Sequence, residues 1–167
     1  DNDLGLWDDE HIKGHQKLTH LCHGFGTKMA IQLAHAGRKS LCVNSTPIAP
    51  SPPIFCENGG DKIPKELSLE EIEDTKRAFV KAAKRAKESG YDILEIHAAH
   101  GYLLCEFLSP ITNKRSDRYG GSLENRCSLV VEICDMIKEA VDLHLMVRVS
   151  ADEWVESGWH VNDTIVL

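Results

Sequence analysis

The sequence lacks the features of several large protein classes. No apolar run approaches the ~20 residues that a helix needs to span a bilayer, and no basic segment followed by an apolar one opens the chain. Basic charge is not in excess, because 19 Lys and Arg stand against 26 Asp and Glu, for a net charge of −7. Proteins that bind a phosphate backbone usually present basic fields. We therefore expect neither a membrane nor a nucleic-acid partner.

The six cysteines include no C-x-x-C pair and lie at positions 22, 42, 56, 105, 127 and 134. This scatter is typical of reduced thiols in a cytoplasmic protein and argues against a disulfide framework or a zinc site. His11 and His15 are spaced like a metal pair, but two histidines alone do not define a metal site, so no metal is expected. Cys105 is of separate interest because it lies one helical turn beyond Tyr102.

Strands and helices are expected to alternate along the chain. Capping residues and apolar spacing predict helices that begin at Asp8, at the capping box of Ser68, and at Ser122. The first helix carries Leu18, Leu21, Cys22 and Phe25 at 3/4 spacing. The predicted helices span 8–22, 68–89 and 122–140, and a last one begins at 161. The predicted strands span 27–33, 92–97 and 145–150. Residues 40–65 form a long loop rich in Pro, Ser and Asn, which is typical of a functional lid.

Period-two alternation assigns the two faces of each strand. Leu33, Ile96 and Val149 belong to apolar faces, which we expect to lie under the helices. Gln32, His97 and Arg148 belong to faces that turn polar toward the carboxyl end of each strand. An open doubly wound sheet would be apolar on both faces, whereas a barrel binds ligands at the carboxyl ends of its strands. The fold class is therefore α/β, a partial (β/α)8 TIM barrel with about three parallel βα units.

The segment His97-Ala98-Ala99-His100-Gly101-Tyr102 follows the second predicted strand and places two imidazoles and a phenol within six residues. Two imidazole N–H groups aimed at one oxygen act as an oxyanion hole, each contributing on the order of 3 kcal/mol. A phenol remains protonated at neutral pH and serves as a general acid, typically contributing about 10²–10⁴ in rate. The segment therefore predicts a site that stabilises charge on a substrate oxygen and delivers a proton beside it.

The chain resembles the Old Yellow Enzyme family of FMN-dependent ene-reductases, in particular its NADPH dehydrogenases. Three blocks carry the resemblance in order: IQLAHAGRK at 31–39, EIHAAHGYLL at 95–104 continuing through EFLSP at 106–110, and NKR at 113–115 through DRYGGSLENR at 117–126 to VRVS at 147–150. The likeness extends over nearly the whole chain. It implies that residues 1–167 are the central segment of a single FMN-binding barrel domain, incomplete at both ends.

The resemblance also implies roles for individual residues. Gln32 would bond the pyrimidine edge of FMN, and Arg148 would lie near its N1 and O2. His97 and His100 would bind the carbonyl or nitro oxygen of a small-molecule substrate, and Tyr102 would donate the proton. NADPH, or NADH, would supply the hydride, and the full-length protein could be a homo-oligomer. Arg38 and Lys39 would lie near the mouth, while Cys105 replaces a histidine found in some relatives, which leaves pocket shape and substrate choice open.

Structural interpretations compete with these roles. Gln32 could fill the barrel as an amide, and Arg148 could pair with Glu95 on the neighbouring strand. The charged residues between 115 and 126 (Arg115, Asp117, Arg118, Glu124 and Arg126) are more typical of a network of loop and helix-cap contacts than of catalysis.

Two functional hypotheses of different class remain at this point. One is the working central segment of a flavin ene-reductase, with a dienoyl-CoA reductase-like enzyme as the variant within that class. The other is a non-catalytic remnant or interaction module. A complete barrel needs about 250 residues, and the late strands commonly bind the cofactor phosphate. We therefore expect the chain alone to bind FMN weakly or not at all.

Overall fold

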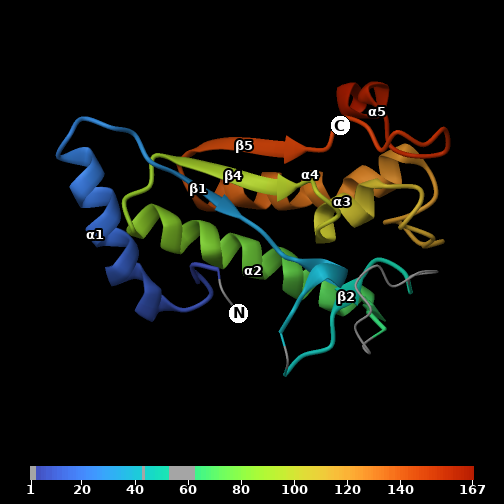
Figure 1. The fold of residues 1–167 in the computed structure, drawn as a ribbon, viewed down its shortest axis with the longest axis horizontal. Helices are drawn as coiled ribbons and strands as arrows, with labels where there is room; N and C mark the ends of the chain where they lie inside the picture. The colour runs from blue at the N-terminus through green and yellow to red at the C-terminus, as the bar shows by residue number, and fades with distance from the viewer. Residues whose placement is uncertain (1–2, 43, 53–62) are drawn as a thin grey trace.

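The computed structural model describes residues 3–42, 44–52 and 63–167, and its centre is a three-stranded parallel sheet. The strand order is β1 (Ala30–Leu33), β4 (Ile93–Ala98) and β5 (His144–Val149). The long helices α2 (Leu69–Glu88) and α4 (Leu123–Ala140) lie along the sheet, and all three strands point toward the same end (Figure 1). The predicted α/β class with parallel βα units is confirmed.

Shorter elements complete the chain. They are η1 (Asp9–His11), α1 (Ile12–His23), η2 (Gly37–Lys39), β2 (Ile48–Ala49), β3 (Lys65–Glu66), α3 (Leu103–Leu108) and α5 (Val161–Val166). The first strand begins three residues later than predicted. Its entry is irregular because the Asp92 side chain accepts the Met29 N–H, while Met29 O accepts both the Asp92 and the Ile93 N–H. None of the helices in the described ranges is long and apolar enough to cross a bilayer.

Two of the three predicted helix starts are confirmed by their caps, and the third is displaced. The Ser68 hydroxyl accepts the Glu71 N–H while the Glu71 carboxylate accepts the Ser68 N–H, so the capping box is complete. The Ser122 side chain caps α4 in the same way through the Asn125 N–H. Asp8 also acts as a cap, but it opens the short η1 turn, and the α-helix begins only at Ile12.

The apolar stripe of α1 does not face the core. Leu18, Leu21 and Phe25 are 44%, 61% and 83% exposed. The buried side of α1 is held by polar contacts instead. His15 bonds the Tyr91 hydroxyl at 2.8 Å, and Thr19 donates to a backbone carbonyl at the end of α2 at 2.6 Å. The 3/4 spacing of these residues therefore does not indicate which face of the helix is buried.

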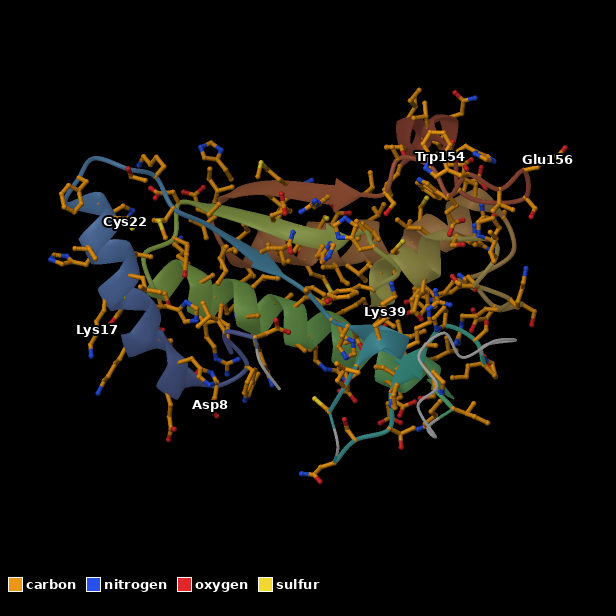
Figure 2. All side chains as sticks on the ribbon, in the orientation of Figure 1. Asp8, Lys17, Cys22, Lys39, Trp154 and Glu156 are labelled. Atoms are coloured by element: carbon orange, nitrogen blue, oxygen red, sulfur yellow. The ribbon has the colours of Figure 1, made fainter. Side chains whose placement is uncertain are left out.

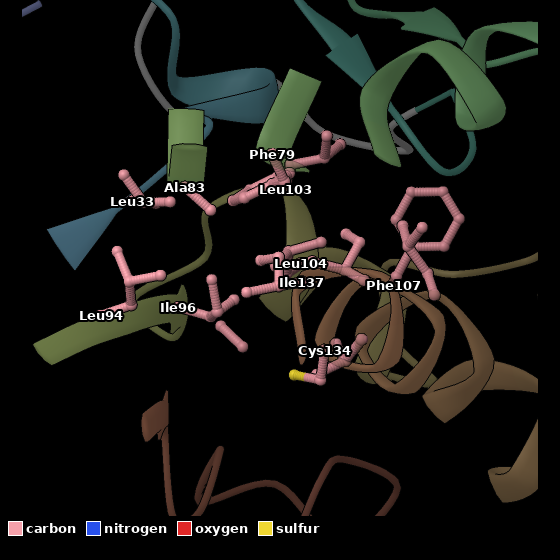
Figure 3. Packing of buried hydrophobic residues seen from close by; sticks show 14 of the residues in the cluster. Leu33, Phe79, Ala83, Leu94, Ile96, Leu103, Leu104, Phe107, Cys134 and Ile137 are labelled. Carbon is pink, nitrogen blue, oxygen red and sulfur yellow. The ribbon is translucent and has the colours of Figure 1, made fainter. Parts of the chain in front are cut away.

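The core lies between the sheet and the two long helices. Leu33, Leu94 and Ile96 lie on the helix side of the sheet, and Figure 3 shows them with Ala83 of α2 and Ile137 of α4 in one apolar cluster. Leu94, Ile96, Ala83 and Ile137 are at most 1% exposed. The apolar face predicted for the strands is thus confirmed for β1 and β4. On β5, Val147 remains 39% exposed, so only part of that strand's apolar side is covered.

The long loop predicted over residues 40–65 contains structure. β2 and β3 pair in parallel, and residues 53–62, with Cys56, lie outside the described residues. Arg115 anchors this region, because its Nη1 donates to the carbonyls of Pro50 at 2.8 Å and Leu67 at 2.7 Å while its Nε and Nη2 bind Asp117. Arg126 caps two further carbonyls, those of Leu108 and Gly121. The structural interpretation of this charged segment is confirmed by these contacts.

Candidate active site

The polar residues predicted from alternation share the sheet face opposite α2 and α4. The strand register places Gln32 beside Glu95, and Glu95 beside Met146, in one row across the sheet. His97 and Arg148 are register partners in the next row toward the carboxyl ends. Because register partners in a parallel sheet project to the same side, these residues form one polar surface in two rows.

A tight turn follows β4 and carries the second imidazole. His100 and Gly101 both have positive φ, at 59° and 67°, and the Tyr102 N–H donates to Ala99 O at 3.1 Å. Two positive φ values between a bonded first and fourth residue define a type I′ turn. A left-handed conformation at a non-glycine residue costs of order 1–3 kcal/mol, and such strain gathers at functional sites.

The turn brings three rings together at the end of β4. The His97 ring centroid lies 5.0 Å from that of His100 at an interplanar angle of 75°, and 4.9 Å from that of Tyr102 at 52°. His97 is 5% exposed, Tyr102 is half-buried, and His100 is exposed. The three residues predicted to bind and protonate a substrate therefore form one cluster, with His97 at its centre.

His97 is buried with an unsatisfied polar atom. Its Nδ1 has no hydrogen-bond partner within the described structure. Burial lowers the pKa of this imidazole below its ordinary value, and the nearby His100 and Arg148 act in the same direction, which outweighs the opposite effect of Glu95. His97 is therefore neutral at pH 7. A buried polar atom without a partner costs free energy, so this nitrogen is a candidate for bonding to a ligand.

Gln32 and Arg148 lie on the same face of the sheet but differ in their hydrogen bonding. The Gln32 amide donates to the Glu95 carboxylate across the strand pair. Arg148 is exposed, and its guanidinium makes no hydrogen bond or ion pair with the described residues. The alternative ion pair between Arg148 and Glu95 does not form, because the register sets Arg148 beside His97 and Glu95 beside Gln32.

The sequence did not predict the contacts that support the turn, although the resemblance placed Lys39 near the mouth. The Ser150 hydroxyl accepts the His100 N–H at 3.0 Å, and Lys39 Nζ donates to the His100 carbonyl at 2.9 Å. Lys39 lies beyond the tip of β1 (Figure 2). It belongs to η2, which is held in turn by Glu106, whose Oε1 accepts the Arg38 N–H at 3.0 Å. The one available signal was Glu106 itself, a carboxylate within the otherwise apolar helix LLCEFL.

Cys105 lies beneath the same turn. Burial raises the pKa of its thiol, while the Gly101 backbone and the Ser150 side chain favour the thiolate through hydrogen bonds. Cys105 is partly exposed and has no disulfide partner among the described cysteines. The predicted position of Cys105 close to the cluster is confirmed, in contact with the turn that carries His100.

The His11–His15 pair has other partners. His11 Nδ1 accepts the Asp8 N–H, and His15 bonds the Tyr91 hydroxyl and the Gly5 carbonyl. Over residues 3–42, 44–52 and 63–167, no group of three or more His, Cys, Asp or Glu side chains is placed to hold a metal ion.

Comparison with known proteins adds to this geometry. The profile of the NADH:flavin oxidoreductase / NADH oxidase family matches residues 1–167. The chain belongs to this family. It is 51% identical over 165 residues to the NADPH dehydrogenase of Bacillus licheniformis and 49% identical over 165 residues to that of Bacillus subtilis. Each match covers 99% of this chain and 48% of the relative, so the chain spans about half the length of these relatives.

Solved structures show the same fold. Histamine dehydrogenase from Rhizobium sp. 4-9 has a TM-score of 0.87 at 36% identity, over 95% of this chain and 24% of that one. Old Yellow Enzyme from Pichia sp. AKU4542 has a TM-score of 0.83 at 32% identity, over 94% of this chain and 44% of that one. Its barrel is of the TIM type, and the predicted partial barrel and Old Yellow Enzyme resemblance are therefore confirmed.

Proposed function

We propose that this chain carries the substrate-binding and flavin-ring-binding part of an FMN-dependent NAD(P)H oxidoreductase that reduces the C=C bond of α,β-unsaturated carbonyl or nitro compounds. The observation that carries the proposal is His97: a buried, neutral imidazole with an unpartnered Nδ1, in ring contact with both His100 and Tyr102. Membership of a flavin oxidoreductase family and likeness to NADPH dehydrogenases support the cofactor assignment.

The described residues fit a flavin ring. Gln32 offers an amide, which can both donate and accept, and Arg148 offers a guanidinium with no hydrogen-bond or ion-pair partner among the described residues. Both side chains are exposed on the face that also bears His97. The guanidinium suits the oxygen and nitrogen edge of the ring, where negative charge resides in the reduced form. When bound, FMN supplies hydride transfer, which no protein side chain provides.

The side chains of this chain then have separate tasks. His97, as a neutral imidazole, donates one N–H to the substrate oxygen, and His100 supplies a second donor from the turn. Both hydrogen bonds become stronger as the substrate oxygen gains negative charge, and this lowers the activation barrier to reduction. Tyr102 holds a proton at its phenol oxygen and delivers it to the α carbon as the enolate collapses. The new C–H bond at the β carbon uses the electron pair of the hydride. The π pair of the C=C bond, held in the enolate, forms the second C–H bond at the α carbon with the proton from Tyr102.

A chimera tests the proposal. Residues 1–167 replace the aligned segment of the Bacillus subtilis NADPH dehydrogenase, and NADPH-dependent turnover is measured with 2-cyclohexen-1-one. We expect His97→Ala to lower kcat/KM by about 10²–10³ through loss of an oxyanion donor. His144→Ala is the matched control, because His144 is exposed at the start of β5 and its side chain makes no hydrogen bond or ion pair with the described residues.

Tyr102→Phe separates the proton donor from the binding pair. We expect it to lower kcat by about 10² while the KM for the enone stays nearly unchanged. Tyr91→Phe is its control, since the Tyr91 hydroxyl bonds His15 far from the ring cluster. A chimera that holds FMN and oxidises NADPH but reduces no enone would contradict the proposed reaction, and a chimera that neither holds FMN nor oxidises NADPH would favour the non-catalytic hypothesis.

A further inference from the structure

The backbone of His100 is bonded on both sides by residues that lie outside its own turn. Its N–H donates to the hydroxyl of Ser150, which follows β5, and its carbonyl accepts from the ammonium of Lys39, which follows β1. These partners are 50 and 61 residues away along the chain. The loops that follow β1 and β5 are therefore hydrogen-bonded to the turn that follows the central strand, β4.

This turn needs outside support because of its conformation. His100 has φ of 59° without the freedom of a glycine, so the isolated segment favours other conformations. Rotation of His100 to negative φ would redirect its side chain and break the ring contact with His97. A methyl group built on Gly101 would lie 3.1 Å from Lys39 Nζ and 3.2 Å from Lys39 Cε, so the lysine stem lies directly over the turn.

We infer that Lys39 and Ser150 are positioning residues that hold His100 in its left-handed conformation and so keep its imidazole beside that of His97. That this arrangement serves substrate binding rests on the function proposed above. Neither residue touches the proposed substrate oxygen. Lys39 is the stronger of the two contacts, because a hydrogen bond from an ammonium is charge-assisted.

The rest of the structure holds Lys39 in place. Gly37 has φ of 59°, and its amide donates to His35 Nδ1 at 3.0 Å. The neighbouring Arg38 amide donates to the buried carboxylate of Glu106 on α3. The His35 carbonyl accepts the Leu103 N–H at 3.0 Å. The loop after β1 is thus bonded to the start of α3, and Lys39 extends from it over the turn.

The test uses the 167-residue chain itself, without cofactor or substrate. Lys39→Met and Ser150→Ala remove one contact each, and Lys39→Arg keeps a charged donor. Lys84→Met is the matched control, because Lys84 is exposed on α2 and its ammonium makes no hydrogen bond or ion pair with the described part of the chain. The readouts are amide hydrogen exchange at His100 and Tyr102 and the imidazole nitrogen resonances of His97 and His100.

We expect Lys39→Met to raise the exchange rate at Tyr102, whose N–H closes the turn, by about tenfold, the effect of losing one net hydrogen bond. Ser150→Ala should do the same at His100. In both variants the His97 and His100 imidazole resonances move together, and Lys39→Arg restores most of the shift. Exchange in the core strand β4 and in Lys84→Met stays at the parental rate.

Unchanged exchange and unchanged imidazole resonances in both variants would overturn the positioning role. So would a shift that Lys39→Arg does not restore, since that would indicate general loosening. The outcome is independent of the proposed reaction: if the His97→Ala chimera kept its activity while Lys39→Met loosened the turn, the function would fail and the positioning role would stand.

Discussion

The two faces of the sheet differ in how completely the described part of the chain buries their side chains and supplies hydrogen-bond partners for their polar atoms. On the face toward α2 and α4, Leu94 and Ile96 are fully buried in an apolar core. On the opposite face, Met146 is 45% exposed, Gln32 and Arg148 are exposed, and Nδ1 of the buried His97 lacks a partner among the described residues. Apolar burial is therefore concentrated on one face, and the proposed recognition chemistry on the other.

The first and largest expected effect tests the covered face. Leu94→Ala removes apolar volume from a site with no exposure, so we expect the free energy of unfolding to fall by about 3–5 kcal/mol. Met146→Ala, on the open face, should cost less than about 1 kcal/mol because the side chain is already half in water. Urea denaturation of both variants measures the difference. Equal losses would show that the two faces are not distinct.

The second effect concerns the support of the open face. An alanine methyl at Gly37 would collide with the Glu106 carboxylate and lie 2.9 Å from the Leu103 backbone, at φ of 59°. We expect Gly37→Ala to cost about 2–4 kcal/mol. Gly26→Ala is the control, because Gly26 has φ of 76° but nothing within 4 Å, so only conformational strain of about 1 kcal/mol applies. Thermal unfolding of the two variants measures the loss of stability in each. A larger loss in Gly37→Ala than in Gly26→Ala is the part caused by steric collision, and equal losses would contradict the close packing around Gly37.

The smallest expected effect is the pH dependence of stability that arises from His97 and His160. Burial lowers the pKa of His97, whereas a hydrogen bond to Asp152 raises the pKa of His160 in the loop after β5. Below the ordinary histidine value of 6.5, the unfolded chain binds a proton at His97 that the folded chain resists, so this residue reduces stability as pH falls. For His160 the sign is opposite: its contribution is complete below 6.5 and is lost as pH rises through its folded pKa.

Histidine ring resonances followed from pH 5 to 8 check this prediction. His97 should have its midpoint below 6.5 and His160 above it. The reverse order would mean that the ring cluster is hydrated and that His97 carries a positive charge at neutral pH.

Local patterns explain why much of the fold could be predicted. The Ser68 capping box and the Ser122 cap are short-range signals, and alternation correctly separated Leu94 and Ile96 from Glu95 and His97. Local spacing was less informative in α1, where Leu18 and Leu21, and Phe25 just after the helix, are exposed. Spacing identifies a stripe, but only tertiary contacts decide what it faces, and here polar contacts of His15 and Thr19 decided it.

The site was predictable to a similar extent. The ring cluster is local in sequence, so His97, His100 and Tyr102 could be identified together. Whether Arg148 would bond Glu95 depended on strand register, which alternation leaves open by two residues. Lys39 and Ser150 lie 61 and 50 residues from His100 along the chain and bond its backbone atoms. Every residue type has these backbone atoms, so the identity of residue 100 does not indicate the contacts.

Enone turnover in the chimera is the most direct test of the claim that His97 binds the substrate oxygen. We predict that the parental chimera reduces 2-cyclohexen-1-one with NADPH, and that His97→Ala loses about two to three orders of magnitude in kcat/KM while His144→Ala retains the parental value. Parental kcat/KM in both variants would contradict the account.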